Sequence, residues 1–220
     1  MSLEKIHLRK LLQIFDADPA QRKSLLRADI RSEIAKKAGP GEDGGDFHVA
    51  FWADAKRHAA GELDLREQAK LRVAASKNRF RLYPMLADGF LIWWDEKRRW
   101  RNEPLNVIPQ GVSDRYDASG LGQIKIENLL AVDAEGSFRR IIYPYFSERP
   151  ILTAESARLG LWVMSQCFKG YSLDEMRILD VLRGASFASV DYPFIGNEEA
   201  LFLSQYEAVL GQWHELWKEY

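Results

Sequence analysis

Residues 121–148, LGQIKIENLLAVDAEGSFRRIIYPYFSE, predict a β-hairpin. Apolar and charged residues alternate roughly over 124–130, which is typical of a strand with one face against a core. The segment DAEG at 133–136 supplies a short polar turn, whose glycine can adopt a positive φ. Residues 138–146 are rich in aromatic and β-branched side chains, which favour a pleated surface. Because Pro144 has no amide hydrogen for a ladder, we expect an edge, a bulge or an ending of the second strand there.

The composition is that of an ordinary globular protein. The 220 residues are 46% hydrophobic and 29% charged, enough for a core of one or two domains. A net charge of -1 gives the whole molecule no bulk attraction to nucleic acid, but it allows a local basic patch. No apolar run approaches the roughly 18 residues of a membrane span, and residues 1–15 have no signal-peptide core. The single cysteine, Cys167, suits a reducing compartment, so we expect a cytoplasmic protein without membrane association.

A glycine-rich stretch divides the sequence. Residues 3–37 carry two apolar stripes at helical spacing, and the DADP segment at 16–19 separates them, which predicts two helices. GPGEDGGD at 39–46 is typical of a flexible loop. We therefore expect a helical N-terminal segment at 1–38, a loop at 39–46 and a mixed α/β core domain at 47–220.

The core domain predicts further helices and strands. Residues 63–77 form a charged helix, and residues 83–100 form the next one. A strand is the alternative for FLIWW at 90–94, but the length of the segment and its late cations favour a helix. The other expected elements are a strand within 105–116, the hairpin, a helix from Thr153 to near Gly170, strands at 177–184 and 185–194, and a last helix after Asn197.

This succession of helix, helix, three strands, helix, two strands and helix resembles the PD-(D/E)XK nuclease superfamily, the restriction-endonuclease-like fold, in its exonuclease-type and RecB-type members. The resemblance covers about residues 60–220 and concerns topology and hydrophobic pattern. It implies a mixed α/β fold whose core of about five strands is flanked by helices.

The resemblance also implies a place for catalytic residues. An acid on the second core strand and a second acid on the third, followed two residues later by lysine, would bind a divalent metal and activate water. Glu127 falls near the first acidic position, whereas residues 141–145 read IIYPY, with neither carboxylate nor lysine. One carboxylate is too little for a Mg²⁺ shell, so we expect the usual cutting site to be lost. Magnesium is implied only if a displaced site uses Asp133, Glu135 or Glu148.

Cations and tryptophans gather before the hairpin. Such a cluster can hold a phosphate backbone and stack a base, although a solvated helix end with buried tryptophans explains it equally well. The nucleic-acid-binding candidates are Lys97, Arg98, Arg99 and Arg101, flanked by Trp94 and Trp100, with Arg139 and Arg140 as an extension on the hairpin.

The histidines and the cysteine predict neither a metal site nor a nucleophile. The four histidines, at 7, 48, 58 and 214, are too scattered for a zinc motif, so no metal site is predicted. Cys167 lies on the apolar side of a predicted helix, which favours an inert thiol over a nucleophile.

These observations leave three functional hypotheses. The leading one is a non-catalytic protein of nuclease-like fold that contacts nucleic acid or a protein partner. The second is a protein-interaction module of immunity or regulatory type, with no role in nucleic-acid binding. The third is a metal-dependent nuclease with a displaced active site. Because a fold does not fix a function, the choice depends on the site itself.

Overall fold

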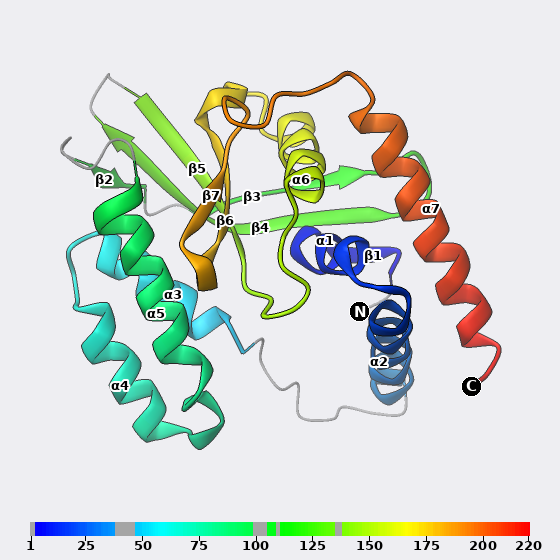
Figure 1. The fold of residues 1–220 in the computed structure, drawn as a ribbon, viewed down its shortest axis with the longest axis horizontal. Helices are drawn as coiled ribbons and strands as arrows, with labels where there is room; N and C mark the ends of the chain where they lie inside the picture. The colour runs from blue at the N-terminus through cyan, green and yellow to red at the C-terminus, as the bar shows by residue number, and fades with distance from the viewer. Residues whose placement is uncertain (1–2, 38–46, 99–104, 109–110, 135–137) are drawn as a thin grey trace.

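The computed structural model describes residues 3–37, 47–98, 105–108, 111–134 and 138–220. Within this part of the chain, seven strands form one open, mixed sheet. Helices cover both faces of the sheet, so the molecule has three layers (Figure 1). The mixed α/β class expected from the sequence is therefore confirmed.

The longest strand, β4 (Gln123–Ala134), organises the sheet. Four strands pair with it: β1 (Lys5–His7) and β3 (Val112–Asp117) with its first half, and β2 (Asn106–Val107) and β5 (Phe138–Tyr145) with its second half. Only β1 runs parallel to β4. The predicted hairpin is confirmed as β4 and β5, and its turn at 135–137 lies outside the described residues.

Beyond β5 the sheet continues with β6 (Met176–Asp180), which runs parallel to β5. Helix α6 (Ala154–Cys167) connects the two, and Thr153 caps it by accepting a hydrogen bond from the Ser156 amide. The last strand, β7 (Ala185–Phe187), is antiparallel to β6. Both are shorter than the predicted strands, because a 3₁₀ turn at Val181–Arg183 separates them and no strand follows Phe187.

One face of the sheet packs against α1 (Leu8–Asp16), α2 (Pro19–Lys37), α6 and α7 (Glu198–Trp217). The other packs against α3 (Val49–Ala59), α4 (Leu65–Ala75) and α5 (Leu82–Leu91), which continues as a π-helical turn at Ile92–Lys97. In β4, Ile124 and Ile126 enter the first core, whereas Leu130 and Val132 enter the second. This arrangement keeps apolar residues on both faces of the strand.

Two local predictions were wrong. The first helix begins at Leu8 rather than near Leu3, because residues 5–7 pair with β4 as a strand. The strand expected within 105–116 is divided into β2 and β3. The helix that was favoured over a strand at 90–94 is confirmed, since this segment is helical.

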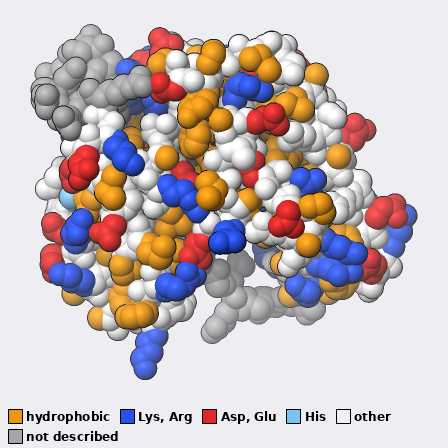
Figure 2. Space-filling model, in the orientation of Figure 1, with side chains coloured by type: hydrophobic (Ala, Val, Ile, Leu, Met, Phe, Trp, Pro, Cys, Tyr) orange, Lys and Arg blue, Asp and Glu red, His pale blue; other side chains and the backbone are white. Residues whose placement is uncertain are grey.

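The N-terminal residues contribute to the same sheet and core as the rest of the described chain. β1 pairs with β4, and α1 buries Leu8, Leu11 and Leu12 beside α6 and α7. The glycine-rich stretch at 39–46 lies outside the described residues. No helix of the described part is both long and apolar enough to span a membrane. Figure 2 shows charged side chains of both signs interspersed with hydrophobic ones across one face of the molecule.

Candidate functional site

The sheet divides where β5 leaves β4. The last pair between these strands is Leu130 opposite Ile142, and toward its start β4 pairs with β1 instead. Asn128 has a φ of 65°, and the register between β3 and β4 shifts just beside it. Pro144 cannot donate to a ladder, and β5 ends one residue after it. Of the three expectations for Pro144, an edge and an ending are both observed, because at this position β5 pairs with β6 but no longer with β4 and ends one residue later.

The start of α1 lies next to this division. The amide of Arg9 donates to the Tyr143 hydroxyl at 2.9 Å, which joins α1 to β5. A groove therefore opens between the N-terminal end of α1 and the C-terminal end of β5. Ligands of open α/β sheets bind at such places, beyond the carboxyl ends of parallel strands.

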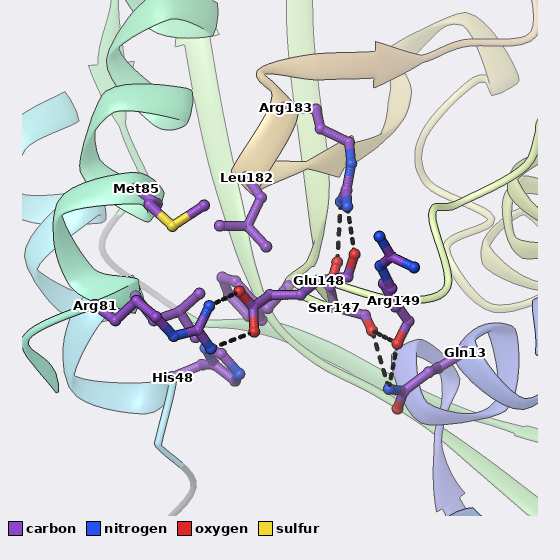
Figure 3. Close-up of a pocket in the computed structure, with 11 residues that line it drawn as sticks. Gln13, His48, Arg81, Met85, Ser147, Glu148, Arg149, Leu182 and Arg183 are labelled. Atoms are coloured by element: carbon purple, nitrogen blue, oxygen red, sulfur yellow. Dashed lines mark hydrogen bonds and ion pairs between the residues drawn. The ribbon is translucent and has the colours of Figure 1, made fainter. Parts of the chain in front are cut away.

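We call this surface the split groove. It consists of two hollows of about 740 and 290 Å³ that share Gln13, His48, Phe146 and Ser147. Figure 3 shows the larger one, with α5 on one side and α1 on the other. The lining residues of the two hollows are His7, Arg9, Lys10, Gln13, His48, Arg81, Leu82, Met85, Tyr145, Phe146, Ser147, Glu148, Arg149, Leu182 and Arg183.

Hydrogen bonds fix the loop that follows β5. The side-chain amide of Gln13 donates to the Ser147 hydroxyl at 2.9 Å, and that hydroxyl donates to the Arg149 carbonyl at 2.7 Å. From the other side, Arg183 donates to the carbonyls of Ser147 and Glu148 (Figure 3). The same guanidinium pairs with Asp180 at 3.0 Å. The base of the groove is thus held in place from α1 and from the 3₁₀ turn that follows β6.

An ion pair spans the rim of the larger hollow. Arg81 and Glu148 face each other with two parallel hydrogen bonds (Figure 3). The hydrogen bond from Arg81 lowers the pKa of Glu148. Because both side chains are exposed, this pair adds little to stability. It can open at little cost when a ligand competes for Arg81.

The split groove carries an excess of positive charge. Among the described residues of its lining are five cations, at positions 9, 10, 81, 149 and 183, and one carboxylate, that of Glu148. Buried acids lie behind two of these cations, since Lys10 pairs with Asp29 and Arg183 with Asp180. Arg149 is exposed, and its guanidinium makes no ion pair with the described residues. The charge excess therefore reaches solvent mainly at the exposed Arg149.

Two histidines of the groove are neutral at neutral pH. The ring of His48 stacks on Phe146 with centroids 4.6 Å apart. Burial, assisted by the charge of Arg9, lowers the pKa of His48 to about 4. Burial likewise lowers the pKa of His7 to about 4. Both rings therefore offer hydrogen bonds rather than positive charge to a bound group.

Glu127, the candidate catalytic residue, stands apart from other carboxylates. The neutral ring of His7 and the guanidinium of Arg115 each lie 3.9 Å from its carboxylate oxygens. In the part of the chain that the structure describes, no group of three or more His, Cys, Asp or Glu residues could hold a metal ion. A positive neighbour beside a lone carboxylate does not favour binding of a divalent cation.

The displaced-site residues do not come together. Asp133 faces Arg139 at the start of β5, whereas Glu148 follows the end of this strand. The eight residues of β5 separate them by roughly 20 Å, too far for one metal ion. Glu135 lies outside the described residues.

The predicted nucleic-acid-binding residues are distributed over other surfaces. Lys97 and Arg98 line a hollow of about 300 Å³ together with Arg177. The Arg98 guanidinium lies 3.8 Å from the centre of the Trp94 ring. Arg139 pairs with Glu175 and lies over Tyr171, while Arg140 donates to the carbonyl of Arg139. Arg99 and Arg101 lie outside the described residues.

The sequence analysis missed the split groove because five separate segments build it, the fifth being the 3₁₀ turn that carries Leu182 and Arg183. Arg9 and Gln13 come from α1, His48 precedes α3, Arg81 precedes α5, and Arg149 follows β5. The one local signal was the polar SER segment at 147–149, directly after the apolar second strand of the hairpin. Cys167 has the properties expected of an inert thiol, since burial raises its pKa to about 12. In comparisons with family models, curated proteins and solved structures, nothing matches this chain.

Proposed function

We propose that this chain is a non-catalytic nucleic-acid-binding protein with a core related to the PD-(D/E)XK fold, and that phosphate groups bind in the split groove. The order of elements supports the relation: α4, α5, β3, β4, β5, α6, β6, β7 and α7 follow one another as the resemblance implies. The strand β2 precedes β3 as an addition to that order.

The observation that carries the proposal is the charge of the groove. The described residues that line it include five cations and one carboxylate, in a chain whose net charge is -1. Arginine binds phosphate with two parallel hydrogen bonds, and most protein contacts to nucleic acid go to the phosphate backbone. The neutral imidazoles, the Ser147 hydroxyl and the Gln13 amide line the same surface and can hydrogen-bond to phosphate or sugar.

Two features support binding without cleavage. The stretch IIYPY at 141–145 has no acid and no lysine. Glu127 lies beside His7 and Arg115 rather than beside a second carboxylate. Metal-assisted hydrolysis requires several oxygen ligands around the cation, which this side chain does not provide alone.

The test is binding to labelled single- and double-stranded DNA and RNA at about 50 mM salt, where phosphate contacts contribute most. We expect the double variant Arg9→Gln/Arg149→Gln to bind at least about tenfold more weakly than the unmodified protein. The matched control, Arg57→Gln/Lys218→Gln, also removes two cations but from exposed sites on α3 and after α7. Equal losses in both double variants, or no binding to any of the four probes, would contradict the proposal.

The non-catalytic part of the proposal has a separate test. We expect no cleavage of these probes with Mg²⁺ or Mn²⁺ beyond that of a buffer control. Metal-dependent cleavage that Glu127→Gln abolishes would assign the chain to the nucleases instead.

A further inference from the structure

A second surface, independent of the split groove, lies between α4 and α5. It is a groove of about 490 Å³ whose lining is largely apolar. Ala69, Val73 and Ala74 line it from α4, Pro84 and Ala87 from α5, and Phe80 from the segment between them. We call it the α4–α5 groove.

Large apolar side chains are exposed to solvent beside this groove, so a partner that covers them would bury apolar surface. Phe80 is 74% exposed, more than any other large hydrophobic residue of the described chain. Leu71, on the same helix as Val73, is 63% exposed. Single exposed apolar residues are common, but exposed ones beside an apolar groove indicate a binding surface.

The shape of the groove fits a helix. Its α4 residues are spaced by three and four positions, so they lie along one side of that helix. Alanines there leave room for another backbone to approach closely. The eleven residues of α4 are about 16 Å long, which matches three turns of a partner helix lying alongside. Such grooves bind amphipathic helices through apolar anchors one turn apart.

The charges around the groove indicate which helix fits. The acids of the rim are already paired, since Asp88 contacts Arg66 at 3.3 Å and Glu67 contacts Lys70 at 2.7 Å. Two further cations, at positions 77 and 79, directly precede Phe80. The surroundings of the apolar strip therefore carry net positive charge, which complements an acidic partner.

The same charges disfavour a second copy of this chain. In a two-fold dimer the same surface lies on both sides of the interface, so the cations around the groove would face those of the other copy. Like charges across an interface oppose association.

We propose that the α4–α5 groove binds an amphipathic helix of a partner protein, with apolar side chains in the groove, Phe80 packed against them, and acidic flanks on the surrounding cations. Among the residues that the structure describes, this docking surface shares none with the lining of the split groove, and α5 contacts the 3₁₀ turn at Val181–Arg183 through Gly89, which does not line the α4–α5 groove.

The test uses two synthetic helical peptides of roughly 15 residues, with leucines one turn apart and either glutamates or lysines on the flanks. Their affinity for the full-length protein is measured by fluorescence anisotropy. We expect the glutamate peptide to bind at least about tenfold more tightly than the lysine peptide at low salt. Phe80→Ser should lower the affinity for the glutamate peptide about tenfold, because Phe80 is an aromatic anchor.

Ile195→Ser is the matched control, since Ile195 is 64% exposed and does not line the groove. It should leave peptide affinity unchanged, and circular dichroism should show both variants folded. Equal affinity for the two peptides, no binding of either, or no effect of Phe80→Ser would overturn the proposal. Sedimentation that shows a dimer lost in Phe80→Ser would assign the groove to a second copy of the chain.

Discussion

At the scale of single residues, buried acids constrain the structure most strongly. Asp29, Asp54, Asp180 and Glu198 are all buried, and each pairs with a cation. Asp54 is the clearest case, because it is 3% exposed at its side chain and accepts two hydrogen bonds from Arg72, at 2.8 and 3.0 Å. This pair joins α3 to α4.

We predict that Arg72→Met destabilises the protein by about 3 kcal/mol, because it leaves the Asp54 carboxylate buried without its partner. The control is Arg57→Met, which removes an exposed pair with Glu62 and should cost less than about 0.5 kcal/mol. Urea unfolding followed by circular dichroism measures both. Similar unfolding free energies for the two variants would show that the Asp54 pair is not the constraint we infer.

His48 gives the protein a predictable pH dependence. Burial lowers its pKa from 6.5 to about 4 in the folded state. Between these values the unfolded chain binds more protons, so the free energy of unfolding falls as the pH drops from about 6.5 to 4. Allowing for its partial exposure, we expect a loss of about 2 kcal/mol from this residue.

His48→Gln should therefore reduce the difference in unfolding free energy between pH 7 and pH 4.5. Part of the difference should persist, because burial also lowers the pKa of His7 to about 4. Urea titrations at the two pH values give the comparison. An unchanged pH dependence in the variant would mean that His48 is charged in the folded protein.

At the scale of elements, α5 packs unusually closely against the 3₁₀ turn at Val181–Arg183. A β-carbon at Gly89 would lie 2.1 Å from the Val181 carbonyl oxygen and 2.6 Å from that of Leu182. Because backbone atoms cannot move aside cheaply, this contact fixes how α5 approaches the end of β6. It thereby sets the position of the wall that Met85 and Leu182 share in the split groove.

Gly89→Ala should destabilise the protein by about 2 kcal/mol or more, since the clash outweighs the higher helix propensity of alanine. Gly211→Ala is the control, because Gly211 lies in α7 with open space around it. There alanine should stabilise the protein by about 0.5 to 1 kcal/mol. Thermal unfolding measures the stability of both variants. An unchanged stability of Gly89→Ala would contradict the close contact between α5 and the 3₁₀ turn.

The sequence predicted those elements whose periodicity is local. Helices α4 and α6 and the β4–β5 hairpin carry their own caps, breakers and alternation. Strand β1 could not be predicted in this way, because its three residues continue the apolar spacing of α1 and are a strand only through pairing with β4. The division into β2 and β3 could not be predicted either, because it depends on which residues of β4 pair with each of these strands.

The functional surfaces were less predictable than the fold. The cluster at 97–101 was predicted to bind nucleic acid because its cations are close together in the sequence. Of these cations, the structure describes only Lys97 and Arg98. Apart from the adjacent Arg9 and Lys10, the cations of the split groove are separated by tens of residues, so only the folded sheet brings them together. Glu127 was correctly placed on the long central strand, but its neighbours His7 and Arg115 come from other strands.

At the scale of the whole molecule, the account depends on how charge is arranged rather than on its total. A net charge of -1 would give little attraction to a polyanion if charges were evenly spread. The split of the sheet at Asn128 and Pro144 gathers cations at one edge, while buried acids such as Asp29 and Asp180 remain behind the surface. Phosphate at this edge would contact cations before it contacts acids.

The most direct test of this central claim is the salt dependence of nucleic-acid affinity. Each phosphate contact contributes about 0.9 to the slope of log affinity against log salt concentration on duplex DNA. We predict that Arg149→Gln reduces the magnitude of this slope by about one, whereas Arg57→Gln leaves it unchanged. The same slope in all three proteins, or no measurable binding at about 50 mM salt, would show that phosphate does not bind in the split groove.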